Sequence, residues 1–173
     1  GAASLARGLE AALPVDFVTE YARLSALSDL YASLAPTASV TSQWGQLWFL
    51  GTNTQVNVFT IDAATLAAAG GGYHFYAPTN SSIIINVTGF ANRTVFANTG
   101  FNFCTGYTNA TTFTGCSQVN TDNPGGLSSR LLWNFDSDVQ TTIAFGGSMA
   151  GSVLAPNVNL QATWGSCTGT FVL

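Results

Sequence analysis

From Ala38 onward the chain is a series of short apolar or alternating segments separated by Gly, Asn, Pro and Ser, and this pattern limits the fold class. Clear examples are residues 56–61 (VNVFTI), 83–87 (IIINV) and 130–135 (RLLWNF). Runs of this length, rich in β-branched and aromatic residues, predict β-strands, and the intervening residues predict turns. Further strands are expected at 47–50, 141–145, 152–162 and 170–173, whereas 99–126 predicts an irregular loop region.

The short strands are compatible with two architectures. Strands about one layer long with corner glycines such as Gly165 and Gly169 are typical of a β-solenoid, or β-helix-like stack. A β-sandwich with Greek-key turns would produce a similar string of segments. Periodicity alone therefore predicts a mainly β fold and leaves the choice between stack and sandwich open.

A helical pattern dominates only the first 34 residues. Residues 2–13 repeat leucine every fourth position and end at Pro14, and a second helix is expected from the N-cap Asp16 to Leu34. The second helix carries an apolar stripe from Phe17 to Leu34, and its opposite face is small and polar (Ser25, Ser28, Asp29 and Ser33). We expect the stripe to pack against a sheet. Residues 62–70 predict one or two further helical turns capped by Asp62.

No linker divides the 173 residues, so we expect an N-terminal extension over 1–14 and a single β-rich domain with a leading helix over 15–173. Only 7% of the residues are charged and none is lysine, against about 25% charged in an average soluble domain. The net charge of −4 argues against nucleic-acid binding, and no apolar run approaches the ~20 residues that span a bilayer. Such a surface stays soluble through hydroxyls, amides, glycans or burial in an assembly.

Cysteines and glycosylation motifs point to an extracellular location. Cys104 and Cys116 flank 11 residues (116 − 104 − 1) rich in Gly, Thr and Asn, which predicts a disulfide in an oxidising compartment; two buried thiols in a cytosolic protein are the alternative. Cys167 is left over, either buried or paired with a partner outside the chain. Four Asn-x-Ser/Thr motifs, at Asn80, Asn86, Asn92 and Asn109, predict N-glycosylation in a eukaryotic source.

Residues for catalysis are scarce. His74, the only histidine, lies in a strand-like aromatic run without a nucleophile elbow, so a packed strand histidine is the preferred interpretation. Asp136 and Asp138 could bind Ca²⁺ with backbone oxygens, but a solvated turn is favoured because further acids are absent nearby. We predict no enzymatic activity and no cofactor apart from covalent N-glycans.

Two of the four tryptophans are candidates for ligand contact. Trp48 and Trp133 lie in strand-like apolar runs and are predicted core residues. Trp44 and Trp164 lie beside glycines, where an exposed indole could stack on a sugar ring.

Several segments together resemble the choice-of-anchor A family, an adhesive-type domain of microbial surface proteins. They are Leu24–Leu27, Val58–Ile61 ahead of Asp62, Ile84–Gly89, Leu132–Phe135 and Gly151–Val158. The similarity runs from about Val15 to the C-terminus and implies an extracellular β-helical domain with a helix along its side, used for adhesion or as a scaffold, without enzymatic activity. The family's Asn-Val-Thr/Ser-Gly piece also occurs where nothing is glycosylated, so Asn86 can be a structural residue. The Gly-rich opening layers of the family are replaced by residues 1–14, and a strand expected after Leu173 is missing, so both ends of the stack are expected to be incomplete.

Together these observations predict an extracellular structural or adhesive glycoprotein module, possibly a self-assembling subunit of a surface fibre. An open β-stack would associate head to tail, with residues 1–13 bridging subunits. The alternative is a monomeric glycan-binding or ice-binding domain of a larger adhesin, which would contact surface glycans or ice through Trp44, Trp164 or threonine side chains.

Overall fold

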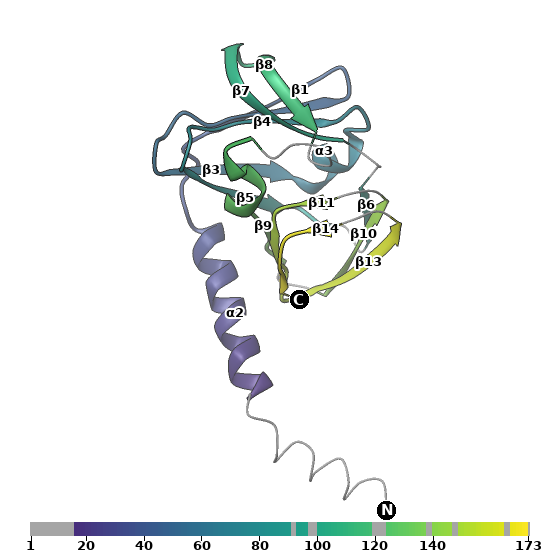
Figure 1. Ribbon diagram of the computed structural model, residues 1–173. Helices are drawn as coiled ribbons and strands as arrows, with labels where there is room; N and C mark the ends of the chain where they lie inside the picture. The colour runs from purple at the N-terminus through teal and green to yellow at the C-terminus, as the bar shows by residue number, and fades with distance from the viewer. Residues whose placement is uncertain are drawn as a thin grey trace, which may run out of the picture.

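The computed structural model describes residues 16–90, 93–96, 100–118, 124–137, 140–146, 149–164 and 167–172 (Figure 1). The elements run as α2 (Phe17–Ala32), β1 (Ser39–Gln43), β2 (Gln46–Leu50), β3 (Val56–Asp62), α3 (Ala63–Ala68), β4 (Tyr73–Tyr76), β5 (Ser82–Thr88), β6 (Arg93–Phe96), β7 (Phe101–Asn109), β8 (Thr112–Gln118), the 3₁₀ helix η1 (Pro124–Arg130), β9 (Leu131–Phe135), β10 (Thr141–Gly146), β11 (Met149–Ala150), β12 (Ser152–Leu154), β13 (Val158–Trp164), β14 (Cys167–Thr168) and β15 (Phe171–Val172). The prediction of a mainly β fold is confirmed.

Most strands pair in parallel. One five-stranded sheet has the order β15-β12-β9-β5-β3, a three-stranded sheet the order β13-β10-β6, and β11 pairs with β14; every pair in these sheets is parallel. The second five-stranded sheet, β1-β2-β4-β7-β8, is parallel in its middle and antiparallel at both edges. Consecutive strands β4, β5 and β6 lie in three different sheets, and β7, β9 and β10 visit the same three sheets again.

The core follows from this parallel register, which brings equivalent positions of successive strands together. Phe49, Phe75 and Phe103 are paired neighbours on β2, β4 and β7, and each is fully buried. The rings of Phe49 and Phe75 stack with centroids 4.6 Å apart. Trp133, the predicted core tryptophan of β9, is 1% exposed, and its indole N–H donates to the Ala150 carbonyl at 2.9 Å.

Two sequence-based expectations about the first sheet are wrong. Trp48 is not a core residue, because it points to the opposite side of β2 from the buried Leu47 and Phe49 and is half-buried there. The region 99–126 is not an irregular loop, since it contains the β7–β8 hairpin. Many of the hairpin's side chains are exposed on both faces, so no apolar alternation marks it in the sequence.

The leading helix begins as predicted and docks with an unexpected face. The Asp16 side chain accepts hydrogen bonds from the backbone N–H groups of Val18 and Thr19, as an N-cap does. The helix ends at Ala32, and its single buried residue is Ser28, from the face predicted to be solvent-exposed. Phe17, at the start of the apolar stripe, is 65% exposed.

A ladder of buried amides explains this orientation. Asn86 and Asn134 are paired neighbours on β5 and β9 and are 1% and 0% exposed. Asn134 Nδ2 donates to the Ser28 carbonyl and to Asn86 Oδ1, each at 3.0 Å, and Ser28 Oγ donates to Asn134 Oδ1 at 2.7 Å. Asn86 Nδ2 donates to the Tyr31 carbonyl at 2.7 Å. A polar helix face is therefore what the outer side of this sheet requires.

The helix and the sheet match in spacing. Tyr31 and Ser28 are three residues apart, a rise of about 4.5 Å, and they meet strands spaced about 4.8 Å apart. Towards its N-terminus the helix keeps one further polar contact, in which the Tyr21 hydroxyl donates to Asn157 Oδ1. Figure 1 shows the N-terminal half of α2 extending past the strands.

Candidate functional site

The β1–β2 turn holds a tryptophan in a conformation that tryptophan rarely adopts. Gln43 pairs with Gln46, so the turn consists of Trp44 and Gly45 alone, and their φ angles are +53° and +73°. Two positive φ values define a type I′ turn, in which Asn-Gly is the common pair. A bulky residue in this region costs about 1–3 kcal/mol, and such strain concentrates at functional positions.

The Trp44 ring is presented to solvent. The residue is 85% exposed, and the backbone beside it is glycine: Gly45 in the turn and Gly71 in the neighbouring loop. The Gly71 N–H donates to the Gly45 carbonyl at 2.8 Å, which holds the two loops together. Because these glycines carry no side chains, the indole stands clear of its surroundings.

Amide side chains border the same turn. Gln46 is half-buried, and its Nε2 lies 3.5 Å from the Gly71 carbonyl. Gln43 Oε1 is buried and has no hydrogen-bond partner among the described residues, so it retains an acceptor for a ligand or water. We call Gln43, Trp44, Gln46 and Gly71 the hairpin-tip face. It combines a flat apolar ring with neutral hydrogen-bonding groups.

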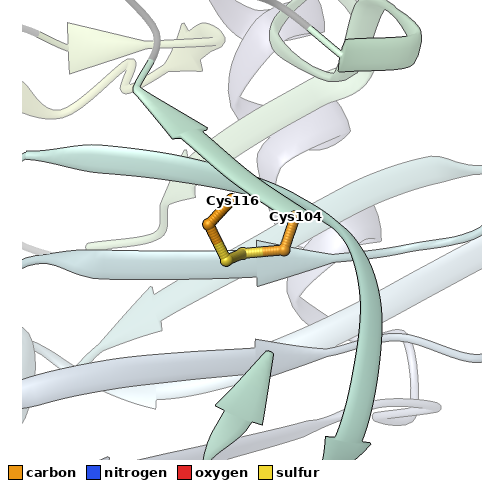
Figure 2. Close-up of a disulfide and its surroundings, with 2 residues drawn as sticks. All are labelled: Cys104 and Cys116. Carbon is orange, nitrogen blue, oxygen red and sulfur yellow. A yellow bond between two sulfur atoms is a disulfide. The ribbon is translucent and has the colours of Figure 1, made fainter. Parts of the chain in front are cut away.

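A second cluster lies on the outer side of the same sheet. The predicted disulfide is confirmed: Cys104 and Cys116 are opposite one another on β7 and β8 and are joined, as Figure 2 shows. Trp48 stacks on His74 with centroids 4.1 Å apart and an interplanar angle of 12°. Both His74 ring nitrogens and Trp48 Nε1 are buried without a hydrogen-bond partner in the described part of the chain. Burial lowers the pKa of His74, since it disfavours the imidazolium.

The glycosylation motifs fall in contrasting environments. Asn80 is exposed in the turn before β5, and Asn109 is exposed at the tip of the β7–β8 hairpin, where its Oδ1 accepts from the Thr111 N–H at 3.0 Å. Asn86 belongs to the buried amide ladder. Asn92 lies outside the described residues. Glycosylation itself stays a prediction.

Other candidates cannot be placed. The side chains of Trp164 and Cys167, together with Asp138 and residues 1–14, lie outside what the structure describes, so the Asp136–Asp138 pair and the bridging segment stay predictions. The amide ladder and the Trp48–His74 contact were missed from the sequence. A signal for the ladder does exist, because Asn occurs between buried apolar residues in both Ile85-Asn86-Val87 and Trp133-Asn134-Phe135.

The fold and these sites define a disulfide-bonded, mainly β domain that exposes a strained aromatic contact residue. The chain belongs to the "Putative Ice-binding-like adhesive domain" family, whose model matches residues 4–173. This match establishes an adhesive-domain family, not the choice-of-anchor A family inferred from individual segments. No curated protein and no solved structure matches the chain.

The family and the Cys104–Cys116 disulfide are consistent with an extracellular or cell-surface location. Among the described helices, none combines the length and apolar character needed to cross a bilayer.

Proposed function

We propose that this domain is an extracellular adhesive module that contacts its target through the hairpin-tip face. The observation that carries the proposal is Trp44, which is 85% exposed and held at a positive φ. Asn at this position would relieve the strain, so the indole is best explained by what it contacts. Family membership supports the adhesive role.

We infer that the body behind this face is a short β-solenoid. Its support is the repeated visit of consecutive strands to three sheets, with partners 17 residues apart between β10 and β13 (160 − 143) and 18 apart between β12 and β15 (171 − 153). A near-constant repeat of this size is what one turn of a three-sided stack requires. The antiparallel pairing of a Greek-key sandwich occurs only at the edges of one sheet.

The target favoured by the hairpin-tip face is a neutral glycan. An indole can cover the apolar face of a pyranose ring, while Gln43 and Gln46 can bond its hydroxyls. Ice binding would need aligned threonines on successive strands. The exposed threonines of β7 and β8 instead lie on a two-stranded hairpin, a structure that twists strongly, and β13 exposes Asn159 and Gln161.

A glycan array followed by calorimetry on the retained glycans tests this proposal. Trp44→Asn, which suits the turn, should lower glycan affinity at least ~10-fold while raising stability, because removing strain and removing the stacking partner are separate effects. The matched control is Phe17→Ala, which removes an equally exposed aromatic residue from α2 and should leave glycan binding unchanged. Full binding by Trp44→Asn, or no glycan retained by the unaltered domain, would contradict the proposal.

A second candidate function, head-to-tail self-association, rests on the length of α2. Sixteen residues of helix span about 24 Å, whereas the five strands beneath it span about 19 Å. From Ser28 on β9, Phe17 lies about 16 Å along the helix, but β15 lies only two strand spacings, or about 10 Å, away. Phe17 and Val18, 65% and 81% exposed, thus overhang the described strands.

We propose that a strand layer from a second copy stacks on β15 and covers this overhang, with residues 1–13 as the bridging segment. Burying two apolar side chains and a free strand edge would drive such association. Phe17→Asp and deletion of residues 1–13 should each convert filaments into monomers, measured by negative-stain electron microscopy and light scattering, whereas Trp44→Asn should not. Unchanged filaments in both variants, or a monomeric unaltered chain, would refute self-association and leave the glycan proposal untouched.

A further inference from the structure

We propose that His74, Cys104 and Cys116 form a binding site for a thiophilic metal ion of the Zn²⁺ class when the Cys104–Cys116 disulfide is reduced. The metal-ligating atoms of the three residues all lie within 4.8 Å of one another. This proposal is independent of the adhesive function.

The strand register brings the three side chains together. His74 on β4 is paired with Asn102 on β7, so Cys104, two residues further along β7, points to the same side of the sheet as Asn102. Cys116 is directly opposite Cys104 on β8. A histidine on one strand therefore faces two cysteines on the adjoining hairpin.

The imidazole is positioned but not used. Buried polar atoms in folded proteins nearly always have a hydrogen-bond partner, yet neither ring nitrogen of His74 has one among the described residues. Trp48 covers one face of the ring at 4.1 Å, and Phe113 closes edge-on against Trp48 at 5.1 Å. This packing fixes the ring while leaving its nitrogens free. Burial also lowers the pKa of His74, which keeps the imidazole neutral and able to bind a metal near pH 7.

Access for a reductant comes from the hairpin side. Cys104 is 2% exposed, but Cys116 is exposed on the edge strand β8. A small thiol reductant can attack there: two R–SH reduce the disulfide to two cysteine thiols and are oxidised to R–S–S–R. Binding of Zn²⁺ then displaces one proton from each thiol, so two protons are released for each ion bound.

The ligand set fits a tetrahedral site with one open position. Zn–S bonds of about 2.3 Å place two tetrahedral sulfurs about 3.8 Å apart, within the span of the cluster. Two thiolates and one imidazole are soft to borderline ligands that favour Zn²⁺ or Cu⁺ over Ca²⁺ or Mg²⁺. Water at the exposed Cys116 side would complete the coordination.

Titration with Co²⁺, a spectroscopic substitute for Zn²⁺, tests the site. The protein carries Cys167→Ser throughout, so that only Cys104 and Cys116 supply thiols, and a phosphine serves as reductant. Reduced protein should bind one Co²⁺ with a thiolate-to-cobalt charge-transfer band that Zn²⁺ abolishes, and oxidised protein should show no band. His74→Gln should raise the Kd at least ~10-fold, and Cys104→Ser should remove the band.

Circular dichroism keeps these outcomes decisive. Zn²⁺ should raise the Tm of the reduced protein and leave that of the oxidised protein unchanged. Absence of the band in folded reduced protein, equal affinity in His74→Gln, or a reduced protein that stays unfolded in excess Zn²⁺ would each overturn the proposal.

Discussion

Replacing Asn134 by alanine should destabilise the domain more than any surface substitution, because this side chain connects helix and sheet. Asn134 is 0% exposed and takes part in three hydrogen bonds, two with Ser28 and one with Asn86. At about 1 kcal/mol for each bond, the loss is about 3 kcal/mol. Buried donors and acceptors left without partners, and the cavity left by the amide, raise this towards about 5 kcal/mol.

Urea unfolding followed by far-UV circular dichroism and Trp fluorescence measures this loss. For a domain of this size, 3 kcal/mol corresponds to a fall in Tm of about 6–12 °C. Asn159→Ala is the matched control, since Asn159 is exposed on β13, and it should change the free energy of unfolding by less than about 0.5 kcal/mol.

A double-mutant cycle with Ser28→Ala tests the proposed cause. Ser28→Ala should cost about 1 kcal/mol in the unaltered protein and close to nothing when Asn134 is already alanine, because the shared bond is then absent. Additive effects of the two substitutions, or an Asn134→Ala protein as stable as the Asn159→Ala control, would refute the ladder as the connection between α2 and the sheet.

Three further predictions concern the disulfide, the histidine and the glycosylation motifs. Replacing Cys104 and Cys116 by serine should lower the free energy of unfolding by about 3 kcal/mol from loop closure, measured by urea unfolding without reductant; an unchanged midpoint would contradict this. Since burial lowers the pKa of His74 in the folded state, the unfolded chain binds the proton more readily, so stability should fall as the pH drops through about 6.5 and below. In His74→Gln this part of the pH dependence should disappear from the unfolding curves, and an unchanged slope would assign it to other groups. Peptide mass spectrometry of protein from a eukaryotic secretory host should find glycan on the exposed Asn109 and none on the buried Asn86; the reverse pattern would conflict with the burial of the ladder.

Local signals predicted most elements well. The N-caps Asp16 and Asp62 mark the beginnings of α2 and α3, because a carboxylate can reach the free N–H groups of the first turn from sequence position alone. The strand at 83–87 was predicted from its apolar run and lies within β5. The disulfide was predicted because its two cysteines are close in sequence.

Features that depend on distant partners were not predicted. The apolar stripe of α2 suggested the wrong docking face, since only the folded sheet places Asn86 and Asn134 opposite Ser28. Trp48 was assigned to the core because an apolar run does not reveal which side of a strand faces inward. For the hairpin-tip face, the sequence indicated Trp44 through its neighbouring glycine, but the positive φ that sets this residue apart is visible only in the structure.

The amide ladder links two rulers with slightly different graduations, like the scales of a vernier. Three residues of helix advance about 4.5 Å and one strand advances about 4.8 Å, so the two scales diverge by about 0.3 Å at each step. Over two or three steps hydrogen bonds can absorb the difference, but over many steps they cannot. In descendants of this chain, duplication of a strand layer should therefore be accompanied by insertion of three helical residues, and a straight helix of this kind can follow only a short stack.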